Sequence, residues 1–306
     1  MSETLPGQPA RWRSPRVAAV LSIGVVAAIA AAVVMATRSA DGPSAAEGRR
    51  DAYGVSHVHG LGVDPRDEAL IVATHHGLFR IAAGASAAEP VGASLQDTMG
   101  FTIVGPGRYF ASGHPDLPGR DAGQPVQLGL IESNDGGQTW SDVSLSGEVD
   151  LHAIGYAHDR VYGWDAGSGR FMVSGDGIAW EDRSTPDLYG FAVDPADPDH
   201  VVGAGAGGLL ESADGGRSWQ PTAGPPLVTL SWHPTFGLWG LDAAGAVHQL
   251  IGDDWVPVGR LAGVPQVLLA SAGGLYAAVE ERSDGTTSIY RSSDGEEWTL
   301  LFGDAR

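Results

Sequence analysis

A short turn that ends in tryptophan returns along this chain, and its spacing constrains the fold more than any other feature. Two copies are complete, Ser133-Asn-Asp-Gly-Gly-Gln-Thr-Trp140 and Ser212-Ala-Asp-Gly-Gly-Arg-Ser-Trp219. Two are one residue shorter, Ser174-Gly-Asp-Gly-Ile-Ala-Trp180 and Ser292-Ser-Asp-Gly-Glu-Glu-Trp298, and Asp253-Asp-Trp255 is a degenerate fifth copy. The five tryptophans are 40, 39, 36 and 43 residues apart. A period near 40 residues, with turn residues at fixed offsets, predicts small sheets arranged radially.

The repeated segment resembles the Asp-box, or BNR, repeat Ser-x-Asp-x-Gly-x-x-Trp of sialidase-type propellers. The resemblance covers about residues 56–302. The segments His-Val-His-Gly-Leu, Thr-His-His-Gly-Leu-Phe and Ser-Gly-His-Pro-Asp are similar to exported bacterial propellers labelled glycosyl hydrolase or exo-sialidase by similarity. In that family the box is a structural turn on the blade rim, so the resemblance implies a fold and leaves the activity open.

An alternating apolar strand followed by a turn marks the start of each repeat unit. The segment His59-Gly-Leu-Gly-Val-Asp-Pro65 matches Tyr189-Gly-Phe-Ala-Val-Asp-Pro195, and three further segments fit the same frame. The units then begin near residues 56, 97, 150, 187, 226 and 264. We therefore predict an all-β fold, a six-bladed β-propeller with four-stranded antiparallel blades over residues 56–306, with five or seven blades as the alternatives.

The residues before the repeats have a different composition. Arg11, Arg13 and Arg16 precede an uncharged run over residues 17–37, which is long enough to span a bilayer as a helix. We predict a cytoplasmic basic tail (1–16), a transmembrane anchor (17–37) and a linker (38–55). The propeller would then lie outside the cytoplasm in a single-pass protein of the cell membrane. A signal peptide cleaved after Ala36, and hence secretion, is the alternative.

The charge of the chain restricts its partners. Eighteen arginines and no lysine oppose 37 acidic residues, which gives a formal net charge of −19 at pH 7. This excess of negative charge argues against nucleic-acid binding, which needs a basic surface. The absence of cysteine excludes disulfides and thiolate metal sites.

Six of the ten histidines fall on one face of the predicted propeller. The loop before the innermost strand of a blade and the loop between its second and third strands open on the same face. The histidines in such loops are His57, His59, His75, His76, His114 and His152. Because imidazole binds zinc and copper, we predict that these residues form one metal-binding cluster at the channel mouth. Polar lining of the channel is the alternative.

Residues at related positions of neighbouring units extend this site. We predict that a ligand contacts acidic, aromatic and thioether side chains there, namely Asp97, Met99, Asp150, Trp164, Asp165 and Tyr189. Carboxylates in this set also fit a glycoside hydrolase. A sialidase would need three arginines in one pocket as well, for which the candidates are Arg80 in Phe-Arg-Ile-Ala, Arg120, Arg170 and Arg282.

These features lead to one functional expectation with two alternatives. We expect a membrane-tethered, extracytoplasmic propeller that binds a ligand, above all a zinc or copper ion, on its histidine-rich face. The first alternative is a sialidase-like glycoside hydrolase that acts on cell-surface or extracellular glycans. The second is a scaffold for protein interactions, which would expose an apolar patch on one face.

Overall fold

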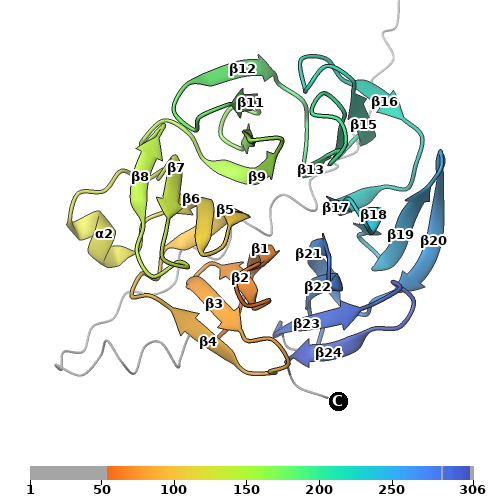
Figure 1. Ribbon diagram of the computed structural model, residues 1–306, viewed down its shortest axis with the longest axis horizontal. Helices are drawn as coiled ribbons and strands as arrows, with labels where there is room; N and C mark the ends of the chain where they lie inside the picture. Colours follow the sequence, from red (N-terminus) through yellow and green to blue (C-terminus); the bar gives the residue numbers. More distant parts are fainter. Residues whose placement is uncertain (1–53, 284, 304–306) are drawn as a thin grey trace, which may run out of the picture. The chain divides into compact units, whose positions relative to one another are not determined.

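The computed structural model describes residues 54–283 and 285–303 of the 306-residue chain. Its 24 described strands form six four-stranded sheets, and the four strands of each sheet follow one another in the sequence. The sheets surround a common centre as the blades of a propeller (Figure 1). All pairings within the blades are antiparallel. The prediction of an all-β, six-bladed propeller is therefore confirmed.

The first three blades are formed by residues 58–184. Blade one contains β1 (Val58–Val63), β2 (Leu70–Thr74), β3 (Gly77–Ile81) and β4 (Ala88–Val91). Blade two contains β5 (Asp97–Gly105), β6 (Arg108–His114), the short helix α2 (Leu117–Asp121), β7 (Leu130–Ser133) and β8 (Ser141–Ser144). Blade three contains β9 (Leu151–Ala157), β10 (Arg160–Asp165), β11 (Phe171–Ser174) and β12 (Trp180–Ser184).

The remaining three blades complete the ring. Blade four contains β13 (Gly190–Val193), β14 (Val201–Gly205), β15 (Gly208–Ser212) and β16 (Gln220–Thr222). Blade five contains β17 (Leu227–His233), β18 (Gly237–Asp242), β19 (Ala246–Ile251) and β20 (Asp254–Arg260). Blade six contains β21 (Val264–Ser271), β22 (Gly274–Glu280), β23 (Thr287–Ser292) and β24 (Thr299–Phe302). The inner strands begin within three residues of the predicted unit starts.

The predicted basic tail, the membrane anchor at 17–37 and nearly all of the linker lie outside the described residues. Among residues 54–283 and 285–303, no helix is long and apolar enough to cross a membrane.

The apolar core is divided into six clusters, one between each pair of neighbouring blades. The cluster between blades one and six shows how the ring closes. Leu61 and Val72 of blade one pack with Tyr276 and Ile289 of blade six. The ring is therefore closed by side-chain packing between two complete blades, and β1 also contacts β21 at the centre.

The four well-matched repeat segments form one type of turn after the third strand of a blade. In each, the serine Oγ accepts a hydrogen bond from a glycine N–H at 2.7–2.8 Å and donates to the aspartate Oδ1 at 2.8–3.0 Å. The serines are Ser133, Ser174, Ser212 and Ser292. The repeated segments are thus structural turns, as the sequence indicates.

Two of these turns also fasten one blade to the one before it. Trp180 donates its indole N–H to Ser144 Oγ of blade two at 3.0 Å. Trp219 makes the same contact with Ser184 Oγ of blade three, also at 3.0 Å. Each of these serines in turn donates to a glycine carbonyl of the same turn. The tryptophan and the glycine of one turn therefore both bind a single serine hydroxyl on the outer strand of the preceding blade.

Candidate functional site

A β-bulge near the start of the inner strand positions one side chain in each of five described blades. At this place the strand pairing slips by one residue, so that one residue of the inner strand has no partner on the second strand. The bulged residues, which we call the bulge ring, are His59, Met99, His152, Val228 and Gln266. Bulges re-aim side chains and are common next to functional sites. Two imidazoles and a thioether therefore occupy the same position in three neighbouring blades.

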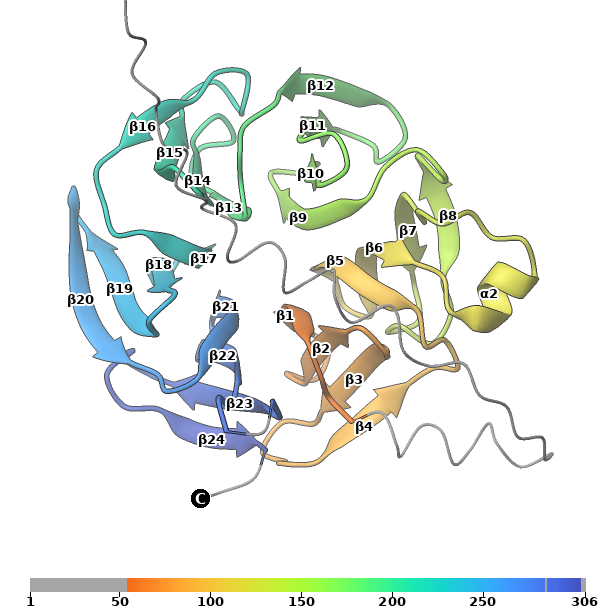
Figure 2. The same cartoon turned by 180° about the vertical axis from the view of Figure 1, so that it is seen from behind.

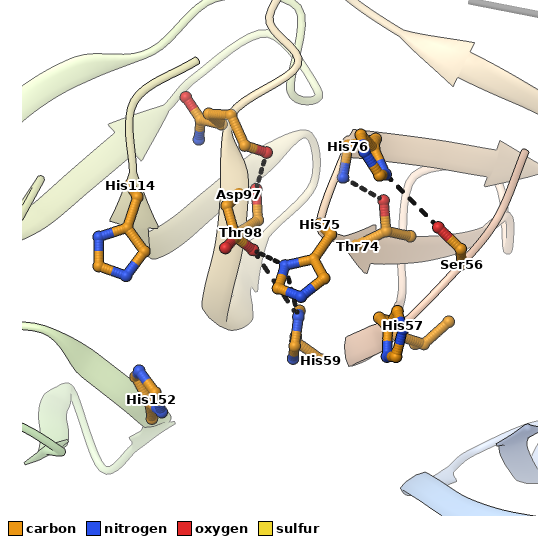
Figure 3. A network of polar contacts seen from close by, with 12 residues as sticks. Ser56, His57, His59, Thr74, His75, His76, Asp97, Thr98, His114 and His152 are labelled. Atoms are coloured by element: carbon orange, nitrogen blue, oxygen red, sulfur yellow. Dashed lines mark hydrogen bonds and ion pairs between the residues drawn. The ribbon is translucent and has the colours of Figure 1, made fainter. Parts of the chain in front are cut away.

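The first cluster consists of His59, His75 and Asp97, and it joins blade one to blade two (Figure 3). His59 is the bulged residue of β1, and Asp97 is the first residue of β5. His75 lies in the two-residue turn between β2 and β3. Thr74 closes this turn, because its hydroxyl donates to the Gly77 carbonyl at 2.9 Å and accepts the N–H of the second turn residue at 3.0 Å.

The three ligand atoms of the first cluster converge. Nδ1 of His75 lies 2.6 Å from Oδ1 of Asp97 and 3.3 Å from Nε2 of His59. Nε2 of His59 lies 3.7 Å from the same carboxylate oxygen. Ligand atoms on a tetrahedral zinc ion are about 3.3 Å apart, given bonds of about 2.0–2.1 Å. Two of the separations are close to that value, and the third reaches it when the hydrogen bond between His75 and Asp97 opens.

The protonation of His59 favours its use as a ligand. Burial lowers the pKa of His59 to about 4, and the nearby His75 lowers it in the same direction, whereas Asp97 acts against them. The imidazole is therefore neutral at pH 7, and one of its ring nitrogens carries a lone pair. Since a metal ion binds only deprotonated imidazole, no proton has to leave this residue before a metal binds.

The second cluster consists of His114, Asp150 and His152, and it joins blade two to blade three. His114 ends β6, Asp150 precedes β9, and His152 is the bulged residue of β9. Oδ2 of Asp150 lies 2.9 Å from Nε2 of His152 and 3.5 Å from Nε2 of His114. The carboxylate is 14% exposed, which leaves the cluster partly shielded from solvent.

His57 and His76 lie beside the first cluster without belonging to it. The ring centroid of His57 is 5.2 Å from that of His75, and its side chain is 59% exposed. The backbone of His57 has a φ of +46°, so the strand alternation that would pair it with His59 does not apply. Nδ1 of His76 lies 3.4 Å from Ser56 Oγ, and its ring centroid is 6.4 Å from that of His75.

Two of the expected ligand-binding residues have structural partners. The Trp164 side chain packs in the core between blades three and four and donates its indole N–H to the Pro186 carbonyl at 3.1 Å. Asp165 is 3% exposed, and its oxygens accept hydrogen bonds from the Asp150 N–H at 3.0 Å and from the Ser168 hydroxyl at 2.5 Å. Asp165 therefore holds the backbone of Asp150 in place.

Two further expected ligand-binding residues, Met99 and Tyr189, lie near the inner-strand starts. Met99 occupies the bulge between those that carry His59 and His152. Tyr189 comes directly before β13 and is 48% exposed.

The six histidines that the sequence placed in one cluster divide between the two clusters, which take two each, and two positions beside the first cluster. Whether they bind a metal ion stays a prediction. One partner had no signal in the sequence, because it is a backbone atom: Nδ1 of His114 donates to the Val126 carbonyl at 2.8 Å.

The candidate arginines of a sialidase site make their described contacts locally. Arg80 pairs with Asp67 of its own blade at 2.7 Å, and Arg120 donates to the Pro115 carbonyl at 3.2 Å. Arg170 pairs with Asp182 of its own blade at 3.0 Å. The atoms that converge at the inner-strand starts are thus imidazoles and carboxylates.

Comparison with known proteins identifies the fold. No family model matches the chain, and no curated protein matches its sequence. The GH74 xyloglucanase from Xanthomonas campestris is similar in structure, with a TM-score of 0.54 and 18% identity over 81% of this chain and 45% of the enzyme. A GH74 enzyme from Niastella koreensis gives 0.53, with 16% identity over 80% of this chain and 37% of its own. A chain of a nidogen–laminin complex gives 0.56, with 12% identity over 77% of this chain and 93% of its own. This chain spans less than half of either GH74 enzyme, and the likeness at these identities is one of fold, that of a β-propeller.

Proposed function

We propose that this protein is a metal-binding propeller whose first cluster holds a transition-metal ion between blades one and two. The observation that carries the proposal is the convergence of three ligand atoms, from His59, His75 and Asp97, within 4.8 Å of one another. Their different origins support it further, since a bulge, a hairpin turn and a strand start from two blades each contribute one ligand.

The ligand set favours zinc or copper. Two imidazoles and one carboxylate suit Zn²⁺ and Cu²⁺, whereas Mg²⁺ and Ca²⁺ prefer oxygen ligands alone. Three protein ligands leave one position of a tetrahedral zinc ion for water or an external ligand. Such a site would let the propeller bind a small molecule through the metal.

The proposal is tested by calorimetric titration of the purified full-length protein with Zn²⁺ and Cu²⁺. We expect His75→Ala to weaken binding to this site by at least roughly tenfold, as the loss of a metal ligand should exceed the effect of losing a residue that only orients one. His233→Ala is the matched control, because His233 ends β17 at the opposite end of an inner strand. Unchanged titrations for the His75 variant, alongside the control, would refute the site.

We further propose that the propeller lies outside the cytoplasm and is tethered by residues 17–37. The uncharged run after three arginines supports this topology. A tag at each end and protease treatment of intact cells test it. A C-terminal tag that stays protected while a secreted control is digested would reverse the orientation, and a mature N-terminus after Ala36 would replace the anchor with a cleaved signal.

Glycan binding is a second candidate function, favoured by Tyr189. Its ring is 48% exposed just before the inner strand of blade four, and an exposed aromatic ring can pack against a sugar. The xyloglucanase with a similar fold gives a first polysaccharide to try. Xyloglucan that slows the protein in affinity electrophoresis, with the effect lost in Tyr189→Ala, would support this function; equal mobility of both proteins would exclude xyloglucan as the ligand.

A further inference from the structure

We propose that His114, Asp150 and His152 form a second metal-ion site, one blade further round the ring. The ion class is the same, Zn²⁺ or Cu²⁺, because the ligands are again two imidazoles and one carboxylate. No ligand is shared with the first cluster, so the second site goes beyond the proposed function and does not require it.

The hydrogen bond of His114 points to a metal ligand. Nδ1 of His114 lies 2.8 Å from the Val126 carbonyl, and a carbonyl only accepts, so Nδ1 must carry the proton. In a neutral ring the lone pair is then on Nε2, which faces Asp150 Oδ2 at 3.5 Å. A histidine that gives its other N–H to a backbone carbonyl and turns a lone pair toward a carboxylate is arranged as metal-bound histidines are.

The electrostatics of this arrangement call for a positive charge. The Nε2 lone pair and the carboxylate oxygen are both acceptors, and they repel each other unless a cation or a proton lies between them. Asp150 provides a second indication of a bound cation, because its Oδ1 is buried and has no hydrogen-bond partner among the described residues. A buried carboxylate oxygen without a partner is costly, and a metal ion bound through both carboxylate oxygens would satisfy it.

The segment between β6 and β7, residues 115–129, fixes the position of the His114 ring. It carries α2 at the outer edge of blade two (Figures 1 and 2) and returns at Val126 to accept the His114 hydrogen bond. Asp116 fixes its first turn, accepting the Gly119 N–H at 2.9 Å and the Leu95 N–H at 3.0 Å. The insertion is thereby bonded to the segment that leads into β5.

The two clusters take their histidine and aspartate from equivalent positions of the repeated blade. In both clusters a histidine at the end of the second strand of a blade, or directly after it, lies near an aspartate at the start of the next blade. The pairs are His75 with Asp97 and His114 with Asp150. The third ligand is the bulged residue of an inner strand in both clusters. In the first cluster it is His59, from the blade of His75, and in the second it is His152, from the blade of Asp150. The use of equivalent positions in both clusters supports a common role for the two clusters.

The number of Zn²⁺ ions that the purified full-length protein retains tests the second site. The protein is stripped with a chelator, loaded with Zn²⁺ in excess Mg²⁺ to occupy exposed carboxylates, and analysed for metal after gel filtration. We expect the wild type to retain two ions, and His114→Ala and Asp150→Asn each one fewer than the wild type. His233→Ala is the control and should equal the wild type. Asp150→Asn keeps the shape of the side chain, so it tests the site even if the His114 variant fails to fold.

The outcomes separate this proposal from the first. A folded His114→Ala or Asp150→Asn protein that retains as many ions as the wild type overturns the second site. Loss of an ion in the His114 variant but not in His75→Ala would support the second site and remove the first. Cu²⁺ electron paramagnetic resonance gives an independent readout, because two sites with different ligand geometry give two signals, and the His114 variant should lose one of them.

Discussion

Asp97 and His114 lie directly opposite each other at the ends of β5 and β6, although each belongs to a different His–Asp cluster. Side chains opposite each other on antiparallel strands have Cβ atoms about 4.5–5.5 Å apart. A ligand of the first cluster and a ligand of the second are therefore neighbours, and ions bound at the two clusters would repel each other across one strand pair.

We expect the two proposed sites to bind metal with negative coupling. For two divalent ions roughly 10 Å apart, even a water-like dielectric gives a repulsion of about 1.5 kcal/mol, or roughly tenfold in affinity. In a calorimetric titration, the second Zn²⁺ should bind the wild type more weakly than the single remaining ion binds His75→Ala or His114→Ala. Identical and independent affinities would contradict the closeness of the two sites.

The stability of the metal-free protein should fall on mild acidification because of His59. Its pKa is about 4 in the folded state and about 6.5 in an unfolded chain. Between these values the unfolded chain binds more protons, so the free energy of unfolding decreases as the pH falls through this window, by at most about 3.4 kcal/mol. Urea unfolding with a chelator at pH 7 and pH 5 measures this effect. His59→Gln should lose less stability than the wild type, and an equal loss would show that His59 is not the buried neutral group.

The turn segments, together with the strand that starts each unit, were enough to predict six blades, with five or seven as the alternatives. Each copy has a chemical reason to be a turn, because Ser and Asp bond the backbone and Gly takes positive φ, as Gly136 and Gly215 do at +79° and +70°. Loops alternate between the two faces of a blade, which is why the face of a histidine followed from its place in the unit. These inferences rest on local rules that neighbouring blades do not change.

The division of the histidines into two clusters was beyond such reasoning. A bulge shifts the alternation of a strand by one residue, but β1 and β9 are buried or half-buried on both faces, so the bulges at His59 and His152 leave no clear trace in the sequence. The positive φ of His57 and the carbonyl that accepts the His114 hydrogen bond also cannot be predicted from the sequence. Trp164 and Asp165 were indistinguishable in sequence from exposed site residues. The packing of blades three and four buries Trp164, and hydrogen bonds within blade three hold Asp165.

Tyr109→Phe should destabilise the contact between blades one and two. Asp64 is fully buried, and it accepts hydrogen bonds from the Tyr109 hydroxyl at 2.7 Å and the Gly107 N–H at 3.2 Å. Burial alone would raise the pKa of Asp64, yet these bonds and the nearby Arg66 hold it below the usual value. Removing one donor from a buried carboxylate costs about 1.5–3 kcal/mol, measured by urea unfolding. The exposed hydroxyl of Tyr156 is the control, and equal effects of the two Tyr→Phe changes would contradict this role of Asp64.

Ser184→Ala should loosen blade three from blade four without removing any apolar contact. The hydroxyl accepts the Trp219 indole N–H at 3.0 Å and donates to the Gly216 carbonyl at 2.5 Å, so the variant leaves two polar groups of the next blade without a partner. Each unmade hydrogen bond costs about 1–3 kcal/mol when fully buried, and the half-buried position of this serine favours the lower end.

Trp219→Ala removes the same bond and the ring that packs on Phe171, with centroids 5.2 Å apart, and should cost about 3–5 kcal/mol. Thermal unfolding of both variants beside the exposed control Ser141→Ala gives the order of the effects. If Ser184→Ala unfolds at the same temperature as Ser141→Ala while Trp219→Ala is strongly destabilised, the Trp219 indole ring alone holds the blades together and the Ser184 hydroxyl does not contribute.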